Sequence, residues 1–321
     1  MKTLAVAVMS LAVLASPGAM AQEKWPAKTI KLIVPYAPGG YTDLTGRITA
    51  RFLEKELGQN VVVENKPGAG GIVGTDLVSK SPADGYTFCV CSVGAVSVAP
   101  VAQTTQYDPL KDLAPVSIVS TIPQTVIVNP KLPIKSIPEL IAYAKANPGK
   151  LTYGSSGAGG LMHFSVQLFD ARTGTKMVHV PFKGGAPATA AVVAGEVDLS
   201  FTNMTDALPQ MEANTVRGIA VTSAKRSPFA PNLPTVEETG VKDFSVESWN
   251  GIIAPPGTPK PVIERMSAAL KKMSEDPEVK EAFAKIGASP VFTTPEEYQA
   301  SIAKEVAQWT GLLKEIKATK N

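Results

Sequence analysis

The chain has 321 residues, 44% of them hydrophobic, which is enough to bury the cores of two domains or of one two-lobed domain. Its net charge is only +3, and its lysines and arginines form no basic stripe with interleaved aromatic residues, which argues against a nucleic-acid-binding protein. With two histidines and two cysteines, the sequence also argues against a His-rich metal site, and no cofactor is expected.

The N-terminus has the pattern of a secretory signal peptide. Lys2 supplies a positive charge, an apolar run extends from Leu4 to Leu14, and Ala19-Met20-Ala21 is a small-residue cleavage site. Residue 22 is Gln, so the cysteine that would carry a lipid anchor is absent, and no later apolar run is long enough to span a bilayer. We expect cleavage after Ala21 and export of a soluble mature protein.

A strand, a turn and a helix then form the first α/β unit. The apolar run Ile30 to Val34 predicts a buried strand, and apolar residues with helical spacing follow from residue 44. The turn between them contains Gly39 and Gly40, where the missing Cβ lets the backbone approach a ligand closely. The first N–H groups of the helix lack internal partners, so the turn predicts a nest for an anion such as a carboxylate. Capping of these N–H groups by Thr42 or Asp43 is the alternative.

The alternation of strands and helices continues to the end of the chain. Further strands are predicted at 61–64, 87–92, 118–128, 151–153, 178–180, 197–201, 218–221 and 244–249. Further helices are predicted at 72–79, 137–146, 160–169, 186–194, 259–274, 277–286 and 295–316. This order favours parallel α/β sheets, in which ligands bind at the carboxyl ends of strands. We interpret 118–128 as the crossing into a second lobe and 244–249 as the return.

Glycine-rich turns recur at these strand ends in both expected lobes. The first lobe has Gly39-Gly40 and Gly68 to Gly71, and the second has Gly154 to Gly160 and Gly184-Gly185. Their recurrence predicts a cleft with anion-binding backbone on both walls.

Three enzyme classes are alternatives to a binding protein, and the third, metal-assisted catalysis, lacks ligands in this sequence. Gly68 to Gly74 resembles a dinucleotide fingerprint, but it is one residue too long and the next strand ends at Ser92 instead of an acid. Gly154 to Ala158 nearly matches the nucleophile elbow of a serine hydrolase, but it ends in Ala. Because the match to the nucleophile elbow is close, a secreted α/β serine hydrolase that uses Ser156 and His163 is the alternative function.

The two cysteines, Cys89 and Cys91, lie in one predicted strand. Residues two apart on a strand point to the same face, at a separation too large for an unstrained disulfide. We expect two buried thiols, because a metal site would need more Cys or His residues nearby.

Several motifs occur together and in a specific order over nearly the whole mature chain. They are Pro35 to Gly40 with Asp43, Glu64 to Gly71, Pro82 to Thr87, Tyr153 to Gly157 with His163, Val180 to Gly184, Trp249 to Gly251 with Ala254-Pro255, and Thr294 to Glu297. In these motifs the chain resembles the Bug, or TctC-like, extracytoplasmic solute receptors of tripartite tricarboxylate transport systems.

The resemblance implies a periplasmic binding protein of the type II fold, in which two lobes, each a mainly parallel sheet flanked by helices, enclose a ligand cleft. We expect residues 1–21 to be the signal peptide, 22–124 and 250–321 to form the first lobe, and 125–249 to form the second. The family implies no catalytic role. Its members bind a dicarboxylate, tricarboxylate, amino acid or aromatic acid by cleft closure, for uptake or sensing. The partners expected are permease subunits of a tripartite transporter or a sensor protein, and the receptor is expected to be a monomer.

The resemblance also implies ligand contacts, to which we add Ser92, Gly157 and Asn203 from strand ends and glycine-rich turns. The predicted contacts are Tyr36, Gly39, Gly40, Asp43 and Ser92 from the first lobe, and Ser155, Ser156, Gly157, His163, Lys183, Gly184 and Asn203 from the second. Asp43 is interpreted either as a partner of a ligand ammonium group or, more simply, as a cap of its own helix. For His163 a structural, partly buried role is the alternative, and for Lys183 a solvated one.

Overall fold

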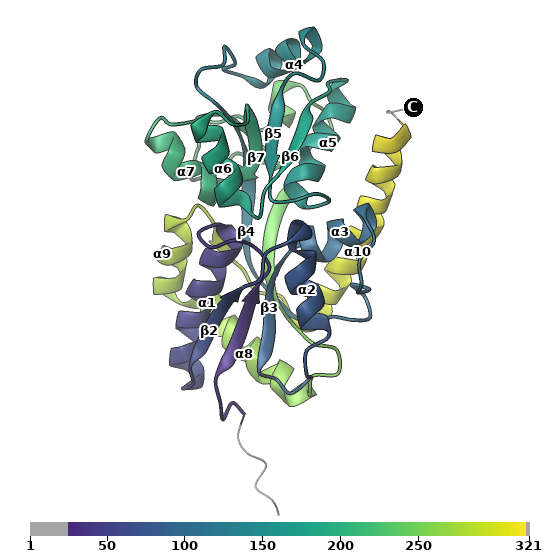
Figure 1. The fold of residues 1–321 in the computed structure, drawn as a ribbon. Helices are drawn as coiled ribbons and strands as arrows, with labels where there is room; N and C mark the ends of the chain where they lie inside the picture. Colours follow the sequence, from purple (N-terminus) through teal and green to yellow (C-terminus); the bar gives the residue numbers. More distant parts are fainter. Residues whose placement is uncertain (1–24, 319–321) are drawn as a thin grey trace, which may run out of the picture.

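Two α/β lobes are stacked end to end along the long axis of the molecule (Figure 1). The computed structural model describes residues 25–318, so the predicted signal peptide lies outside the described residues. The two-lobed binding-protein fold expected from the sequence is confirmed, while the residue boundaries of the lobes stay a prediction.

Ten strands within residues 25–318 are joined by hydrogen bonds in the order β2-β1-β3-β9-β4-β7-β5-β6, and β8 and β10 also pair with β4. The strands are β1 (Ile30–Val34), β2 (Val61–Asn65), β3 (Thr87–Ser92), β4 (Ala114–Val128), β5 (Thr152–Ser155), β6 (Val178–Pro181), β7 (Leu199–Asn203), β8 (Arg217–Val221), β9 (Glu247–Ala254) and β10 (Ser289–Pro290).

Strand β4 belongs to both lobes. Its first part, up to Pro123, pairs antiparallel with β9, and its last part, from Gln124, pairs antiparallel with β7 and β8. The pairs β1–β2, β1–β3, β5–β6 and β5–β7 are parallel, whereas β9 also runs antiparallel to β3. Each sheet is therefore a parallel group joined to antiparallel strands at the crossing between the lobes.

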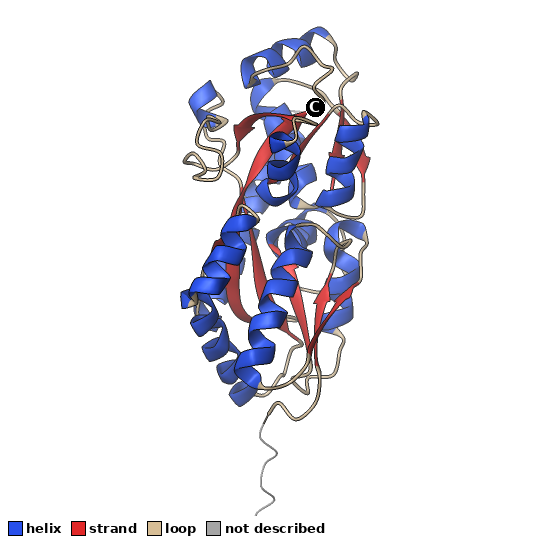
Figure 2. Cartoon of the chain, turned by 90° about the vertical axis from the view of Figure 1, so that its left-hand side faces the viewer, coloured by secondary structure: helices blue, strands red, loops and turns tan. Residues whose placement is uncertain are grey.

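Helices cover both faces of the sheets (Figure 2). They are α1 (Tyr41–Leu57), α2 (Ile72–Ser79), α3 (Ala99–Ala102), α4 (Ile137–Ala146), α5 (Leu161–Thr173), α6 (Gly185–Ala194), α7 (Met204–Glu212), α8 (Lys260–Glu275), α9 (Pro277–Lys285) and α10 (Pro295–Ala318). Between residues 25 and 318, no helix combines the length and the apolar character that a membrane crossing requires.

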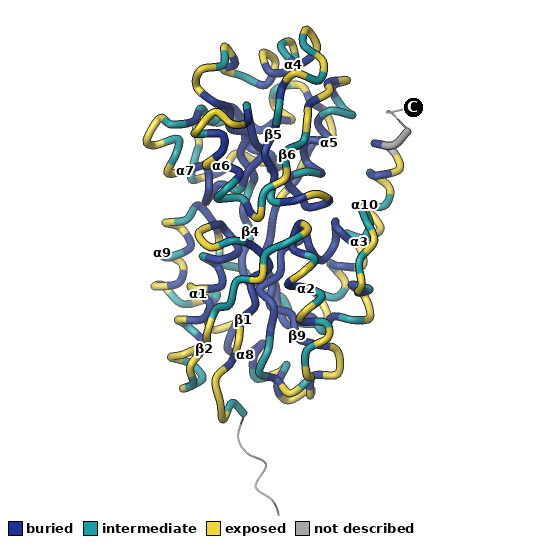
Figure 3. Tube along the Cα trace, viewed as in Figure 1, coloured by how far each residue is buried: buried dark blue, intermediate teal, exposed yellow. Residues whose placement is uncertain are grey.

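The strands form the buried core of each lobe, and the exposed residues lie mainly on the outer helices and loops (Figure 3). In the second lobe, Phe169, Phe201 and Phe244 pack edge to face, with ring centroids 5.4 to 6.4 Å apart. Such aromatic clusters bury large apolar surfaces and fix the position of the elements that carry them. Here they anchor β7 against α5, which places the ends of both at the boundary between the lobes.

Among the segments that differ from the sequence-based expectation, two matter for the site. The stretch between residues 203 and 218, for which no element was predicted, contains helix α7, even though Pro209 lies inside it. The strand predicted at 244–249 lies further along the chain as β9, Glu247–Ala254, which pairs with both β3 and β4.

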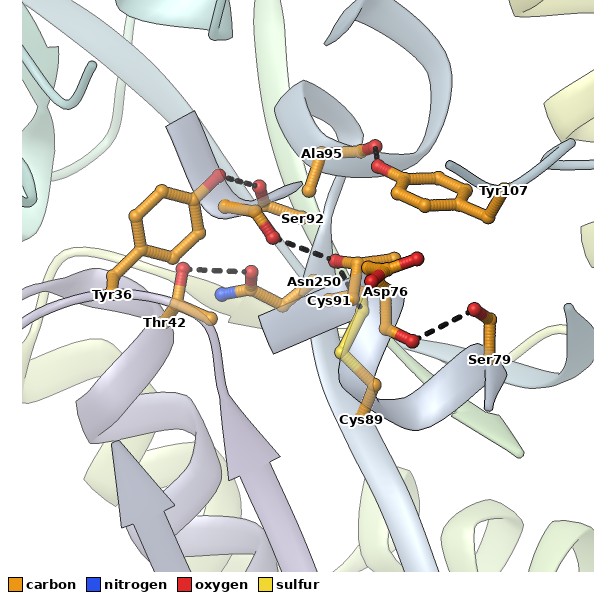
Figure 4. Close-up of a disulfide and its surroundings, with 12 residues drawn as sticks. Tyr36, Thr42, Asp76, Ser79, Cys89, Cys91, Ser92, Ala95, Tyr107 and Asn250 are labelled. Carbon is orange, nitrogen blue, oxygen red and sulfur yellow. Dashed lines mark hydrogen bonds between the residues drawn. A yellow bond between two sulfur atoms is a disulfide. The ribbon is translucent and has the colours of Figure 1, made fainter. Parts of the chain in front are cut away.

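The prediction of two free thiols was wrong, because Cys89 and Cys91 form a disulfide (Figure 4). Two residues of a regular strand span about 6.6 Å. In β3 the Cα atoms of the two cysteines are only 5.3 Å apart. This local shortening of the strand moves the pair from the upper end of the Cα range of disulfides, about 4.4–6.8 Å, to near its most common values.

Candidate functional site

A cavity of about 30 Å³ lies between the two lobes, with room for roughly two or three waters. The first lobe contributes the ends of β1 and β3 and the start of α1 to its walls, and the second contributes the starts of α5, α6 and α7. The residues on which the argument below depends are Tyr36, Gly40, Thr42, Ser92, Gln124, Ser156, Leu161, Gly185, Asn203 and Asp206.

The lobes touch each other directly around this cavity. Ala37 N donates to Lys183 O at 2.9 Å, and Gln103 Nε2 donates to Ala158 O at 2.9 Å. On another side, Thr205 Oγ1 donates to the backbone oxygen of Ile286 at 2.6 Å. The cavity is therefore enclosed by contacts between the lobes.

Two of the glycine-rich turns meet at this boundary. A Cβ on Gly157 would lie 2.5 Å from Gly70 N, and a Cβ on Gly70 would lie 2.9 Å from Ala158 O. Gly70 also has a φ of +66°, a conformation that side chains other than glycine rarely adopt. Glycine is thus required here for the two backbones to approach, and the predicted turns face each other across the boundary.

Four helices begin at the cavity with uncapped N-termini. Their N-cap residues are Gly40 for α1, Gly160 for α5, Gly184 for α6 and Asn203 for α7. The three glycines have no side chain that could cap a helix, and within residues 25–318 the Asn203 side chain accepts no capping hydrogen bond. The first N–H groups of a helix lack internal partners and carry the positive end of its dipole. Converging N-termini therefore make the cavity a favourable place for an anion.

A hydroxyl pair lies on the wall of the first lobe. Tyr36 Oη donates to Gly70 O at 2.8 Å. It also lies 2.7 Å from Ser92 Oγ (Figure 4). Burial raises the pKa of Tyr36 to about 12, against a smaller lowering by the hydrogen bond with Ser92. Tyr36 therefore remains protonated at neutral pH and can hold the Ser92 hydroxyl at the cavity.

Two amide side chains at the cavity each have a buried hydrogen-bonding atom without a partner within residues 25–318. Gln124 accepts a bond from Ser165 Oγ at 2.6 Å through Oε1, but its Nε2 has no partner within residues 25–318. Asn203 Oδ1 likewise has no partner in that part of the chain. An unsatisfied buried polar atom is costly, so each of them points to a missing ligand or water.

Asp206 brings a carboxylate into the same wall. Asp206 is the third residue of α7 and is only 6% exposed. Thr202 Oγ1 donates a hydrogen bond to its Oδ2 at 3.4 Å. Burial raises the pKa of Asp206 to about 7, and the hydrogen bond from Thr202 offsets this only in part. An acid that is half-protonated near neutral pH can accept from, or donate to, a ligand.

Of the twelve predicted contacts, five line the cavity, namely Tyr36, Gly40, Ser92, Ser156 and Asn203. The other seven lie outside its lining and are Gly39, Asp43, Ser155, Gly157, His163, Lys183 and Gly184. Gly157 and Gly184 contribute backbone at the lobe boundary and at the start of α6. Lys183 is exposed, and its backbone oxygen joins the lobes.

Asp43 binds within its own lobe. Its Oδ2 accepts from Gly39 N and from Arg47 Nε, both at 2.9 Å, and its Oδ1 accepts from Asn65 Nδ2 at 2.9 Å. Burial alone would raise the pKa of Asp43, but the bonds from Arg47, Gly39 and Asn65 outweigh it, so the pKa is lowered. Asp43 therefore fixes the turn before α1. It does not cap the helix as the simpler interpretation expects, because Gly39 lies before the helix and α1 has no side-chain cap among the described residues.

Neither His163 nor His179 lines the cavity. His179 Nε2 is 2.6 Å from Ser155 Oγ, and its ring stacks on that of His163 with the centroids 3.9 Å apart. His163 in turn accepts from Gly159 N at 3.0 Å. The serine paired with a histidine is thus the fully buried Ser155 and not the cavity residue Ser156, so this arrangement does not present a nucleophile to a substrate.

Neither Gln124 nor Asp206 was among the residues predicted from the sequence. Gln124 lies where β4 crosses from one lobe to the other, and Asp206 lies on the unpredicted helix α7. The sequence offers one signal for Asp206. It lies three positions after Asn203, a predicted contact, and residues three apart lie on the same face of a helix. As for metals, residues 25–318 contain no group of three His, Cys, Asp or Glu placed to hold an ion.

Comparison with known proteins agrees with the two-lobed fold described above. The family model described as "Tripartite tricarboxylate transporter family receptor" matches residues 45–318. BugT of Bordetella pertussis is 36% identical over 323 residues, covering 99% of this chain and 98% of BugT. The periplasmic binding protein BugD has a TM-score of 0.88 at 35% identity, over 91% of this chain and 99% of BugD. A protein of R. palustris, solved with adipate, has a TM-score of 0.88 at 34% identity, over 91% of this chain and 98% of its own.

These relatives are solute receptors of one fold, with no enzyme among them. The chain belongs to the TctC, or Bug, family of receptors of tripartite tricarboxylate transporters.

Proposed function

We propose that the mature protein binds a small carboxylate in the cavity between its lobes and delivers it to permease subunits of a tripartite transporter or to a sensor. The observation that carries the proposal is the convergence of the uncapped N-termini of α1, α5 and α6 on a cavity that also contains Gln124 Nε2, a donor without a partner within residues 25–318. The related R. palustris protein solved with adipate supports a carboxylate as the ligand.

The energetics favour a ligand held by both lobes. Micromolar affinity corresponds to about 8 kcal/mol. One hydrogen bond to a charged group contributes roughly 1.5–3 kcal/mol, and the loss of rigid-body freedom opposes it. One N-terminus with two donors is therefore insufficient. The starts of α1 and α5, together with Gln124, offer donors from both lobes and from the strand that joins them.

Binding requires the lobes to separate and close. The cavity has room for roughly two or three waters, which is less than a dicarboxylate needs, so we infer that a ligand enters when the contacts between the lobes open. We propose that residues 22–124 and 250–321 move against residues 125–249, with β4 and β9 as the two hinge segments. Export through a signal peptide cleaved after Ala21 would place this monomeric receptor in the periplasm.

Calorimetric titration of a ligand-free preparation with a panel of carboxylates tests the proposal. We expect at least one acid to bind with micromolar affinity or better, and Gln124→Leu to weaken it about tenfold or more, because the buried donor is lost. Ser165 Oγ keeps its bond to Leu161 O in that variant, so the fold should survive. Gln167→Leu, which removes a glutamine of the second lobe outside the cavity lining, is the matched control.

Absence of binding across dicarboxylates, tricarboxylates, amino acids and aromatic acids, with no small molecule in the native mass spectrum of the protein as purified, would overturn the proposal. Equal losses of affinity in Gln124→Leu and Gln167→Leu would place the ligand elsewhere in the cleft.

A further inference from the structure

The wall formed by α7 differs chemically from the rest of the cavity. The starts of α1 and α5 and the Nε2 of Gln124 all present hydrogen-bond donors. The first turn of α7 presents two buried acceptors, Asn203 Oδ1 and the Asp206 carboxylate. An acid in a cavity suited to a carboxylate would repel that ligand unless the ligand brings something else to this wall.

The position of Asp206 is fixed closely by glycines on both sides of the boundary. A Cβ on Gly185 would lie 2.3 Å from Asp206 Oδ2, so this space is open to the carboxylate only because residue 185 is glycine. A Cβ on Gly40 of the first lobe would lie 3.5 Å from Asp206 Oδ1. The carboxylate thus reaches from α7 past α6 to the opposite wall.

An acid in the first turn of a helix often serves only to stabilise the helix dipole. Asp206 does not fit that role well, because a dipole partner can stay exposed and hydrated whereas Asp206 is 6% exposed. Within residues 25–318 its one hydrogen-bond donor is Thr202, at 3.4 Å, and no Lys or Arg pairs with it. Burial without a cation raises the pKa of Asp206 to about 7, so the empty site carries a desolvation cost that a bound cation would relieve.

We propose that Asp206 and Asn203 receive a protonated amine of the ligand, so that the receptor selects a small zwitterion carrying both a carboxylate and an ammonium group. This inference rests on the proposed function, since it assumes that the carboxylate is bound at the donor wall. The ligand would lie across the cavity, with its negative end at Gln124 and the starts of α1 and α5, and its positive end at the first turn of α7.

An ammonium group matches this wall better than a hydroxyl group does. It has three donors, enough for Asp206 and for Asn203 Oδ1 at once, whereas a hydroxyl has one. It also supplies the positive charge that a desolvated carboxylate needs, and charge-assisted hydrogen bonds are about twice as strong as neutral ones.

The test compares acids that share a carbon skeleton and differ in one substituent. Ligand-free protein is titrated calorimetrically at pH 7.5 with alanine, lactate and propionate, and with aspartate, malate and succinate. In the series that binds, we expect the amine to bind about tenfold or more tightly than both the hydroxyl and the unsubstituted acid. Asp206→Asn should reduce that preference to about threefold or less. Glu212→Gln, which removes the same charge from the exposed end of α7, should leave it unchanged.

Asn203→Leu is a second variant that removes an acceptor without changing the charge, and it should lower affinity for the amine more than for the unsubstituted acid. A melting curve for each variant shows that it is folded. If malate, lactate or an unsubstituted acid binds as tightly as its amine, or if Asp206→Asn leaves the preference unchanged, the zwitterion inference is wrong while carboxylate binding stands. If no acid of either series or of the wider carboxylate panel binds, the proposed function itself fails, and the inference fails with it.

Discussion

The N-termini of α1 and α7 make an instructive pair, because each has a buried aspartate as the third residue of its helix. Asp43 lies in α1 on the first-lobe side of the cavity, and Asp206 lies in α7 on the second-lobe side. Asp43 is 2% exposed and Asp206 is 6% exposed. Within residues 25–318, neither helix has a side-chain N-cap. By local sequence position and by burial the two acids are nearly equivalent.

Their partners are very different. Asp43 accepts hydrogen bonds from Gly39 N, Arg47 and Asn65, all within its own lobe. Asp206 accepts one long bond from Thr202 and lines the cavity. Burial raises the pKa of both, but for Asp43 the three partners reverse the shift, whereas the pKa of Asp206 stays at about 7.

The difference separates a structural acid from a candidate binding acid. When the fold supplies the donors itself, a buried carboxylate stabilises a turn and has no capacity left for a ligand. When the fold buries a carboxylate and leaves most of its lone pairs without donors, the unfavourable free energy must be compensated elsewhere or by a ligand. The first case describes Asp43, and the second motivates the role proposed for Asp206.

The largest effect expected from this comparison is a pH-dependent stability that comes from Asp206. Its folded pKa of about 7 lies above the 3.8 of an ordinary aspartate, so between these values the folded protein binds more protons than the unfolded chain. The stabilising contribution of the protonated form is therefore fully present below pH 4 and is lost as the pH rises through 7. Relative to the native protein, Asp206→Asn should gain about 4 kcal/mol of unfolding free energy between pH 4 and pH 8, at about 1.4 kcal/mol per pH unit.

Urea unfolding of ligand-free protein at several pH values measures this difference directly. Glu212→Gln on the same helix is the control and should follow the native curve within about 0.5 kcal/mol, as exposed substitutions usually do. Parallel curves for the native protein and Asp206→Asn from pH 5 to pH 8 would show that Asp206 is ionised without cost, and the contrast with Asp43 would be lost.

Asp43 should respond in the opposite direction. Its folded pKa is lowered, so its stabilisation is present above pH 4 and is lost as the pH falls through the folded pKa. At pH 7, Asp43→Ala should cost roughly 3 kcal/mol, because the bonds from Gly39 N and Asn65 Nδ2 to a buried charge are lost. Arg47→Ala should cost only about 0.5–1 kcal/mol, since its side chain is 52% exposed. Urea unfolding checks both variants, and equal losses would mean that the ion pair, and not the buried turn, provides the stability.

Much of the fold follows from local sequence patterns. The helices predicted at 72–79 and 137–146 coincide with α2 and α4, and the strand predicted at 87–92 coincides with β3. Glycine-rich turns at strand ends, together with the family motifs, placed the cleft between two lobes. These features are local, because apolar spacing, capping residues and glycine act within a few residues of where they occur.

The acceptor wall could not be predicted in the same way. Helix α7 does carry apolar residues at helical spacing, Met204, Ala207, Leu208 and Met211, but it is only nine residues long and contains Pro209. The burial of Asp206 depends on Gly185, which belongs to another helix. The disulfide of β3 depends on a local shortening of the strand that residue spacing does not reveal. The deciding contact for Asp206 is tertiary, and the strand geometry at the cysteines is not encoded in their spacing, so a single sequence carries no direct signal for either.

The smallest expected effect concerns the space in which the Asp206 carboxylate lies. Gly185→Ala would place a methyl group 2.3 Å from Asp206 Oδ2 and 3.1 Å from its Cγ, so the carboxylate must move. We expect a loss of about 1–3 kcal/mol in the native background, as for other overpacked sites. In the Asp206→Ala background the methyl group should fit, because the atoms it meets are gone. A double-mutant cycle by urea unfolding should therefore give a coupling of about 1–2 kcal/mol.

Gly40→Ala is the matched control, because its Cβ would meet Asp206 Oδ1 at 3.5 Å, an ordinary van der Waals contact. Its coupling to Asp206→Ala should stay below about 0.5 kcal/mol, although the substitution also changes the N-cap of α1. If Gly185 and Gly40 couple to Asp206 equally, the carboxylate is not held against α6 but can adopt other positions in the cleft. A carboxylate free to move could turn to water when the site is empty, which would remove the desolvation cost that distinguishes Asp206 from Asp43.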